Sequence, residues 1–298
     1  MSDEASVDWR DLLALPEVQK LIDMALAEDV GDGDVTTRAI FVCPQRVKGR
    51  ILTRKSTVVC GVPLAESIFR RFDPKLQLSR VAAEGASLDA DQTLVELEAD
   101  IRAVLTAERT ALNFLAHLCG IARGARAAVD AVPARCRARI YDTRKTTPGW
   151  RRLEKAAVKT GGAENQRFGL YDAILIKDNH VAAAGSVGKA VTLARRGTLR
   201  DMRVEVEIDR LDQLEEAIAG GADIVLLDNM SPAEMQQAVT AARDRVELEA
   251  SGGVTLAQIP EIARSGVDRI SMGALTHTIV PADLSLELWT QDAKMNQG

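Results

Sequence analysis

The sequence is poor in the residues that build disulfide frameworks, structural metal sites and aromatic ligand cages. It contains four cysteines without a CxxC pair, three histidines and only 3% aromatic residues. Cysteines scattered in this way argue against a disulfide framework and against structural zinc. The low aromatic content indicates that a cyclic ligand would be held mainly by charge.

An excess of positive charge and an N-terminal apolar run are also lacking. The 38 Lys and Arg against 43 Asp and Glu give a formal net charge of -5, so nothing electrostatic favours nucleic acid or an anionic membrane as a partner. The opening segment, MSDEASVDWRDLLALPE, has neither the basic stretch nor the apolar run of a secretory signal or membrane span. We therefore expect a cytoplasmic protein in which any site for an anionic ligand is local.

The 298 residues, 46% of them hydrophobic, are enough for one large barrel or for a barrel with a companion domain. The N-terminal part mixes a helical pattern at 17–28 with strand-like runs at 49–59 and 92–99, which is typical of an α+β unit. Apolar residues recur at helical spacing through 101–127, a stretch long enough to connect two domains. The apolar run at 284–289 is expected to pack back on the first domain.

After Pro133, short β-rich runs alternate with helical stretches. The runs cover residues 138–142, 173–177, 203–208, 223–228, 246–251 and 269–273. These βα steps predict parallel strands that right-handed crossovers close into an incomplete α/β barrel of about six strands. An open doubly wound sheet is the alternative, but DTRK stands at 142–145 where a dinucleotide-binding glycine motif belongs. The chain thus divides into a first domain over 1–122, on which 281–298 pack back, and a second domain over 123–280 that carries the active site.

Nearly every predicted strand ends in a polar or ionisable residue. These residues are Asp142, Arg144, Lys145, Lys177, Glu207, Asp228 and Ser251. Barrel enzymes place their chemistry at the C-terminal ends of the strands, so we expect the active site there. In VEVE at 204–207, alternation puts both glutamates on one face, and we expect that face to point into the barrel because helices cover the other. The alternative is that each charge simply faces water.

Two carboxylates at predicted strand ends are candidates for a metal site. Glu207 and Asp228 suit Mg²⁺ that is held through a few protein oxygens, water and a substrate diphosphate. The alternative is a structural ion pair with Arg203 or Lys177.

Groups that bind anions gather at the same strand ends. The basic residues there are Arg144, Lys145, Arg167 and Lys177. Because Arg offers a planar fork and Lys a compact point charge, this set describes a polyanionic ligand. SGG at 251–253 and MGA at 272–274 let backbone N–H groups approach a phosphate, which barrels often bind after their final strands. A tight turn is the alternative explanation of each glycine motif.

Eight short motifs, spread in order over the chain, resemble the quinolinate phosphoribosyltransferase family. They are ERTALN at 108–113, DTRKT at 142–146, GGAENQR at 161–167, IKDNH at 176–180, VEVE at 204–207, LDNM at 227–230, SGG at 251–253 and GALTH at 273–277. The resemblance implies an α/β sandwich domain joined to an incomplete α/β barrel. It also implies a homodimer in which Arg109 reaches across the interface. The implied reaction, in NAD biosynthesis, gives nicotinate mononucleotide, pyrophosphate and CO2 from quinolinate and phosphoribosyl pyrophosphate, with Mg²⁺ as cofactor.

The resemblance also implies two sets of ligand-binding residues. Quinolinate would be bound by Arg109, Thr143, Arg144, Gln166, Arg167 and Lys177. Phosphoribosyl pyrophosphate would be bound by Lys145, Glu207, Asp228, Ser251, Gly252, Gly253, Gly273 and Ala274, with Glu207 and Asp228 on the metal. The chain departs from the family at Gln166, where members commonly carry His. Glutamine can donate an amide N–H to a carboxylate, but it cannot carry a proton or a positive charge.

Three other functions stay open. The ring substrate could be nicotinate or another anionic ring that is not decarboxylated. Lys177 could be the Schiff-base lysine of a barrel aldolase, although that chemistry requires a desolvated amine. A barrel without catalytic activity could bind a phosphorylated metabolite. The sequence does not decide whether dimers assemble further, or whether Mn²⁺ replaces Mg²⁺.

Overall fold

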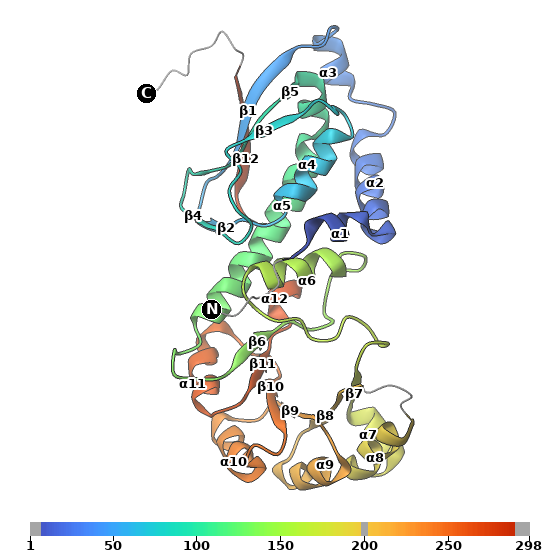
Figure 1. Cartoon of the computed structure of the whole chain (residues 1–298), viewed down its shortest axis with the longest axis vertical. Coiled ribbons are helices and arrows are strands. Elements are labelled where there is room, and N and C mark those ends of the chain that lie inside the picture. Colours follow the sequence, from blue (N-terminus) through green and yellow to red (C-terminus); the bar gives the residue numbers. More distant parts are fainter. Residues whose placement is uncertain (1–6, 198–201, 290–298) are drawn as a thin grey trace. The chain divides into compact units, whose positions relative to one another are not determined.

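The computed structural model describes residues 7–197 and 202–289, which form two compact units (Figure 1). The described residues of the first unit fall within 1–124, 147–162 and 279–298. Those of the second unit fall within 125–146 and 163–278. No helix in these ranges is long and apolar enough to cross a membrane.

The first unit combines helices with antiparallel strands. Its helices before the long connector are α1 (Trp9–Ala14), α2 (Pro16–Val30), α3 (Val35–Ile40) and α4 (Val62–Arg70). Strands β12 (Leu284–Trp289), β1 (Arg46–Thr53), β5 (Thr93–Asp100) and β3 (Gln77–Ser79) form one sheet in this order, and β2 (Thr57–Val58) pairs with β4 (Ser87–Leu88). Strand β12 pairs with β1 from Leu284 opposite Thr53 to Trp289 opposite Lys48. Residues 284–289 thus pack on the first domain as expected, whereas 290–298 of the expected range 281–298 lie outside the described residues.

The predicted connector is a single helix, α5 (Ile101–Asp130). Helix α6 (Arg151–Thr160) and the segment before it belong to the first unit, although the sequence pattern assigned them to the second domain. Two contacts explain this placement: the Trp150 ring stacks on Phe114 of α5 with centroids 4.5 Å apart, and His117 Nε2 lies 2.8 Å from Glu154 Oε1. Contacts between residues so far apart in the chain leave no local trace in the sequence.

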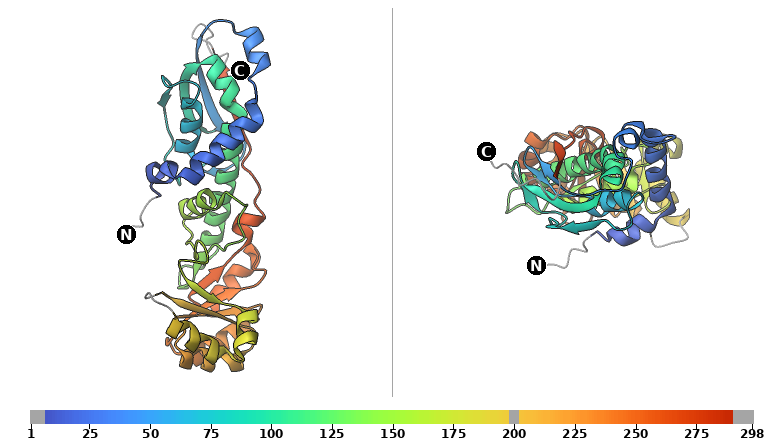
Figure 2. Two further views of the ribbon diagram at one scale, coloured as in Figure 1. Left: turned by 90° about the vertical axis from the view of Figure 1, so that its right-hand side faces the viewer. Right: turned by 90° about the horizontal axis from the view of Figure 1, so that it is seen from above.

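The second unit is the predicted parallel sheet. Its strands are β6 (Arg139–Tyr141), β7 (Ile174–Ile176), β8 (Val204–Ile208), β9 (Ile224–Asp228), β10 (Glu247–Ser251) and β11 (Arg269–Ser271). Its helices are α7 (Asp178–Ala184), α8 (Val187–Gly197), α9 (Leu214–Gly220), α10 (Pro232–Ala242), α11 (Ile259–Arg264) and α12 (Ala274–His277), with short 3-10 turns at Leu211–Gln213 and Leu256–Gln258. Helices α8, α9 and α10 lie on the same, outer side of the strands (Figure 1; Figure 2). All six predicted strands are present, which confirms the α/β class.

The barrel is incomplete between its first two strands. The sheet order is β6-β11-β10-β9-β8-β7, so the first and last strands pair while β7 forms the far edge. The segment that begins at Ala163 runs beside β6 through a parallel bridge between Tyr141 and Glu164. The Glu164 N–H donates to Ile140 O at 2.7 Å, and the Asp142 N–H donates to Glu164 O at 3.0 Å. The chain that leads to Gln166 and Arg167 is therefore fixed to the open side of the first strand.

Candidate active site

The parallel strands bring the predicted barrel residues to one edge, where their carboxyl ends meet. After β6 come Thr143, Arg144 and Lys145, and after β7 comes Lys177. Near or at the ends of β8 and β9 lie Glu207 and Asp228. At the end of β10 lies Ser251, followed by Gly252 and Gly253, and after β11 come Gly273 and Ala274. Arg109 is exposed on α5 in the first unit. Strand direction alone thus accounts for the grouping of all these residues except Arg109.

Two arginines, Arg144 and Arg167, lie close enough to affect each other's charge. Burial lowers the pKa of Arg167, and the neighbouring Arg144 lowers it further. The Arg167 Nη1 group donates to Ala173 O at 3.3 Å. Its Nε is buried without a hydrogen-bond partner among the described residues. Two cations that repel each other in a half-buried place favour an anionic ligand between them.

Lys177 and Glu207 form an ion pair with Nζ and Oε2 3.3 Å apart at the ends of the adjacent strands β7 and β8. The Lys177 side chain is 51% exposed. The ion pair with Lys177, which the sequence left open as an alternative to a metal site at Glu207, is therefore present. Arg203 pairs instead with Glu247 at 2.8 Å, and Asp228 Oδ2 accepts a hydrogen bond from Asn229 Nδ2 at 2.7 Å. A half-exposed lysine beside a carboxylate lacks the desolvation that a Schiff-base amine needs.

The glycine motifs pack against neighbouring loops and require small residues. Gly252 has a φ of +101°, and a Cβ there would collide with the Asn229 side chain. A Cβ at Gly253 would meet nothing within 4 Å, so the backbone at this residue has open space around it. A Cβ at Gly273 would lie 2.9 Å from Lys145 Cδ, and Thr276 Oγ1 donates to Lys145 O at 2.7 Å. These contacts hold the loop of Lys145 against the last strand end.

The inward-facing glutamates form a cluster beneath the strand ends. Glu205 and Glu249 are buried, and the alternation in VEVE predicted this for Glu205. The side-chain amide of Gln166 donates to Glu249 Oε1 at 2.9 Å and to Glu205 Oε1 at 3.4 Å. Burial, together with the charge of Glu249, raises the pKa of Glu205 to about 8. Arg269 completes the cluster, with Nε 2.7 Å from Glu249 Oε2 and its guanidinium 3.8 Å from the centre of the Tyr141 ring.

Arg269 was not predicted from the sequence as a member of this cluster. A charged residue at the start of the short buried run RIS was the available signal. Its partner was not visible, because Arg269 meets Glu249 only through the pairing of β11 with β10.

The carboxylates at the strand ends fit a metal that shares its ligands with a substrate. No group of three or more His, Cys, Asp or Glu residues within 7–197 and 202–289 could hold a metal ion. Glu207 and Asp228 each offer oxygen ligands, and β8 and β9 are neighbours in the sheet. Mg²⁺ commonly binds through one or two carboxylates, water and substrate phosphates, so these two residues fit it.

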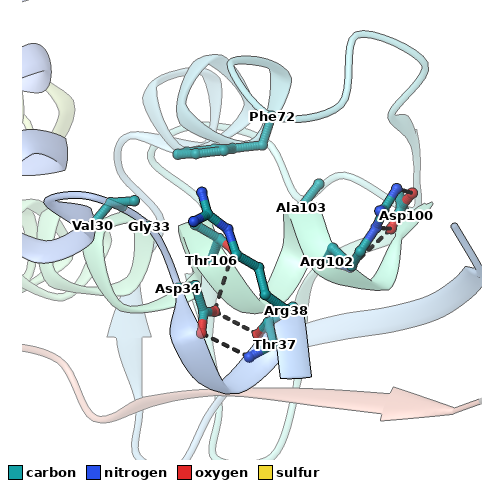
Figure 3. Close-up of a pocket in the computed structure, with 10 residues that line it drawn as sticks. All are labelled: Val30, Gly33, Asp34, Thr37, Arg38, Phe72, Asp100, Arg102, Ala103 and Thr106. Atoms are coloured by element: carbon teal, nitrogen blue, oxygen red, sulfur yellow. Dashed lines mark hydrogen bonds and ion pairs between the residues drawn. The ribbon is translucent and has the colours of Figure 1, made fainter. Parts of the chain in front are cut away.

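The first unit has a pocket of about 280 Å³ between the end of α2, α3 and the start of α5 (Figure 3). Its carboxylates are already engaged: Asp34 accepts from the Thr37 N–H at 2.9 Å, and Asp100 Oδ2 lies 3.0 Å from Arg102 Nη2. The guanidinium of Arg38 points toward the Phe72 ring (Figure 3). None of the residues that line this pocket was predicted as a site residue.

Comparison with known families agrees with this geometry. The N-terminal domain of quinolinate phosphoribosyl transferase matches residues 34–119, and the C-terminal domain of the same family matches residues 121–287. The chain belongs to the quinolinate phosphoribosyltransferase family. The two family domains meet within α5, which is the helix that the sequence predicted as a connector.

Relatives in this family cover nearly the whole chain. A probable nicotinate-nucleotide pyrophosphorylase [carboxylating] of Bacillus subtilis is 38% identical over 272 residues, which are 91% of this chain and 93% of the relative. A nicotinate-nucleotide pyrophosphorylase [carboxylating] of Mycobacterium leprae is 42% identical over 274 residues, 90% of this chain and 95% of the relative. The solved structure of a nicotinate-nucleotide pyrophosphorylase from Francisella tularensis has a TM-score of 0.88 and 38% identity, covering 93% of this chain and 99% of that one. These neighbours confirm the predicted sandwich domain and incomplete barrel.

Proposed function

We propose that this chain is a phosphoribosyl pentosyltransferase that converts quinolinate and phosphoribosyl pyrophosphate into nicotinate mononucleotide, pyrophosphate and CO2. The observation that carries the proposal is the meeting of basic residues, carboxylates and glycine loops at one edge of the barrel of a quinolinate phosphoribosyltransferase family member. That combination offers separate places for a dicarboxylate and for a diphosphate.

The basic residues bind the two carboxylates of quinolinate. Arg144 and Arg167 repel each other in a half-buried place, and a carboxylate bound between them would relieve that repulsion. Lys177 supplies a third positive charge at the end of β7, and Thr143 adds a hydroxyl in the same loop as Arg144. Gln166 belongs to this set through its neighbour Arg167, because its own amide donates to two interior glutamates.

Other residues of the same strand edge bind phosphoribosyl pyrophosphate. Lys145 and the backbone N–H groups around Gly253 and Gly273 are suited to phosphate oxygens, with Ser251, Gly252 and Ala274 beside them. Glu207 and Asp228 would hold Mg²⁺, which when bound neutralises charge that builds on the departing pyrophosphate. The same carboxylates face the ribose, where positive character develops as its bond to pyrophosphate breaks.

The reaction requires no protein nucleophile. The pyridine nitrogen forms a bond to ribose C1 while the bond from C1 to pyrophosphate breaks and its electron pair leaves with pyrophosphate. The ring nitrogen then carries a positive charge, so the electron pair of the breaking bond between C2 and the carboxylate is stabilised by the ring as CO2 departs. A proton from water takes the place of CO2 at C2. The protein contributes by holding both substrates in register.

Arg109 is assigned to the active site of a second copy of the chain, in a homodimer. Its exposure on α5 supports this assignment, since the residue is available to a partner. Mixed dimers of Arg109→Ala and Lys177→Ala chains should regain part of the activity that each variant lacks, because one of the two sites then has both residues. Mixtures without any regain would refute the shared site. Further assembly of the dimers and the cytoplasmic location stay predictions.

Substrate choice separates this function from its competitors. Arg144→Met and Arg167→Met should each raise the Michaelis constant for quinolinate by roughly ten- to hundredfold, the usual loss for a charge-assisted hydrogen bond. Arg196→Met, on the exposed end of α8, serves as the control. Turnover of nicotinate alone would support the transferase without decarboxylation. A borohydride-trapped adduct at Lys177 would support the aldolase instead.

A further inference from the structure

Gln166 occupies an unusual place for a predicted substrate-binding residue. Its side chain is 8% exposed and lies among buried charges inside the barrel. The residue follows the segment that bridges to β6 and directly precedes Arg167. It therefore connects the interior of the barrel to the predicted quinolinate site.

Three hydrogen bonds tie Gln166 to three different parts of the barrel. Its backbone N–H donates to Oδ1 of the fully buried Asp142 at 2.7 Å, at the root of the loop that carries Arg144. Its amide Nε2 donates to Glu249 on β10 at 2.9 Å and, with a longer contact of 3.4 Å, to Glu205 on β8. One residue thus links the loop after β6 to the interior of β10 and β8.

Glu205 interacts with both Gln166 and Arg167. It accepts from Gln166 and also interacts electrostatically with Arg167. The cluster holds the buried Arg269, the half-buried Arg167 and two buried glutamates. It has several arrangements of similar energy, because each cation can pair with either carboxylate. The hydrogen bonds of the Gln166 amide and the ion pair of Arg269 with Glu249 favour the arrangement in which Glu205 interacts with Arg167.

We infer that Gln166 is a positioning residue, which orients Arg167 through Glu205 and the Asp142 loop and does not itself touch quinolinate. This inference rests on the proposed function of the site. It also accounts for the departure from the histidine that the family commonly carries. A glutamine amide offers two N–H donors without a charge, so it serves two carboxylates at once, whereas a neutral histidine offers one donor.

The phosphoribosyl pyrophosphate side of the site is fixed by other contacts. Strands β8, β9 and β10 pair along their lengths, with Ser251 opposite Asp228 and Glu207 opposite Leu226. These backbone ladders do not involve Gln166. Loss of its amide should therefore disturb the dicarboxylate site selectively.

The test measures steady-state constants for both substrates in variants of Gln166. Gln166→Leu should raise the Michaelis constant for quinolinate by roughly ten- to hundredfold, as expected for lost hydrogen bonds to charged groups. The constant for phosphoribosyl pyrophosphate and the turnover number at saturation should change less than about threefold.

Gln166→Asn, which keeps the amide but shortens its reach, should act like Gln166→Leu and covers the case in which that variant does not fold. Gln166→His should stay within about tenfold of the wild type, since one donor remains. Gln237→Leu makes the same change on the exposed face of α10 and should have no effect.

A double-variant cycle separates positioning from direct contact. If Gln166 acts through Arg167, then adding Gln166→Leu to Arg167→Lys should raise the quinolinate constant less than about threefold further. Penalties that multiply would show that Gln166 contacts the substrate and would overturn the inference. Equal losses for both substrates would also overturn it, because they indicate general damage to the barrel. Absence of turnover in the wild-type protein would instead refute the proposed function.

Discussion

The ion pair between Arg269 and Glu249 gives the sharpest test of the barrel interior. The two side chains are 8% and 0% exposed, and Nε lies 2.7 Å from Oε2. Arg269→Met keeps much of the side-chain volume and removes the charge, which leaves Glu249 buried without its cation. Breaking a buried pair in this way typically costs about 3–5 kcal/mol of unfolding free energy. The lost contact of Arg269 with the Tyr141 ring adds about 1 kcal/mol.

The loss of unfolding free energy in Arg269→Met should be larger at higher pH. Burial raises the pKa of Glu249, and removal of Arg269 raises it further because the largest stabilising charge is gone. A carboxyl whose pKa is raised in the folded state stabilises the fold at low pH and loses that contribution as pH rises through the folded pKa. The variant should therefore lose more stability at pH 8 than at pH 5. Glu249→Gln in the same background keeps the acceptor for Gln166 and should recover part of the loss.

Urea unfolding followed by far-UV circular dichroism measures these free energies. Tryptophan fluorescence reports the first unit, which holds Trp9, Trp150 and Trp289, and coincident transitions would justify a two-state analysis. Arg264→Met on the exposed end of α11 is the matched control and should change stability by less than about 0.5 kcal/mol. A loss below about 1 kcal/mol in Arg269→Met, or a further loss on adding Glu249→Gln, would refute the buried pair.

Three shorter predictions concern the barrel interior and the strand ends. The pKa of Glu205 is raised from 4.5 to about 8 in the folded protein, so protonated Glu205 stabilises the fold below pH 4.5, and this stabilisation is lost as the pH rises through 8. Glu205→Gln should therefore flatten the dependence of the melting temperature on pH over this range. An unchanged slope would contradict the raised pKa. Glu207→Lys and Asp228→Lys should each abolish turnover and leave the circular dichroism spectrum unchanged, and near-normal rates in both would refute the metal and ribose assignment. Gly252→Ala should raise the Michaelis constant for phosphoribosyl pyrophosphate and destabilise the protein by at least about 1 kcal/mol, because of its φ of +101° and the collision with Asn229; a stable variant with a normal constant would refute this role.

Local patterns in the sequence predicted most of the fold. The six barrel strands were found because short apolar runs alternate with helical stretches, and the alternation in VEVE correctly placed Glu205 inside the barrel. Strand direction then grouped the polar residues, since all six strands are parallel. These features depend on residues close together in the chain, which a single sequence shows directly.

Two features that depend on distant contacts were not predicted. Helix α6 was assigned to the second domain, because nothing near Trp150 or Glu154 in the sequence indicates their partners Phe114 and His117. The inward direction of the Gln166 amide was missed for the same reason, as its acceptors lie 39 and 83 residues further along the chain. Which residues touch each substrate, and whether Arg109 serves a second copy, stay predictions.

The most direct test of the proposed function is product stoichiometry. The purified protein would be incubated with Mg²⁺, phosphoribosyl pyrophosphate and quinolinate, and nicotinate mononucleotide, pyrophosphate and CO2 would be measured together, with nicotinate as the control substrate. We expect equal amounts of all three products from quinolinate and little or no turnover of nicotinate. Pyrophosphate release with nicotinate alone would contradict the dicarboxylate assignment, and no turnover with either ring would contradict the proposed function altogether.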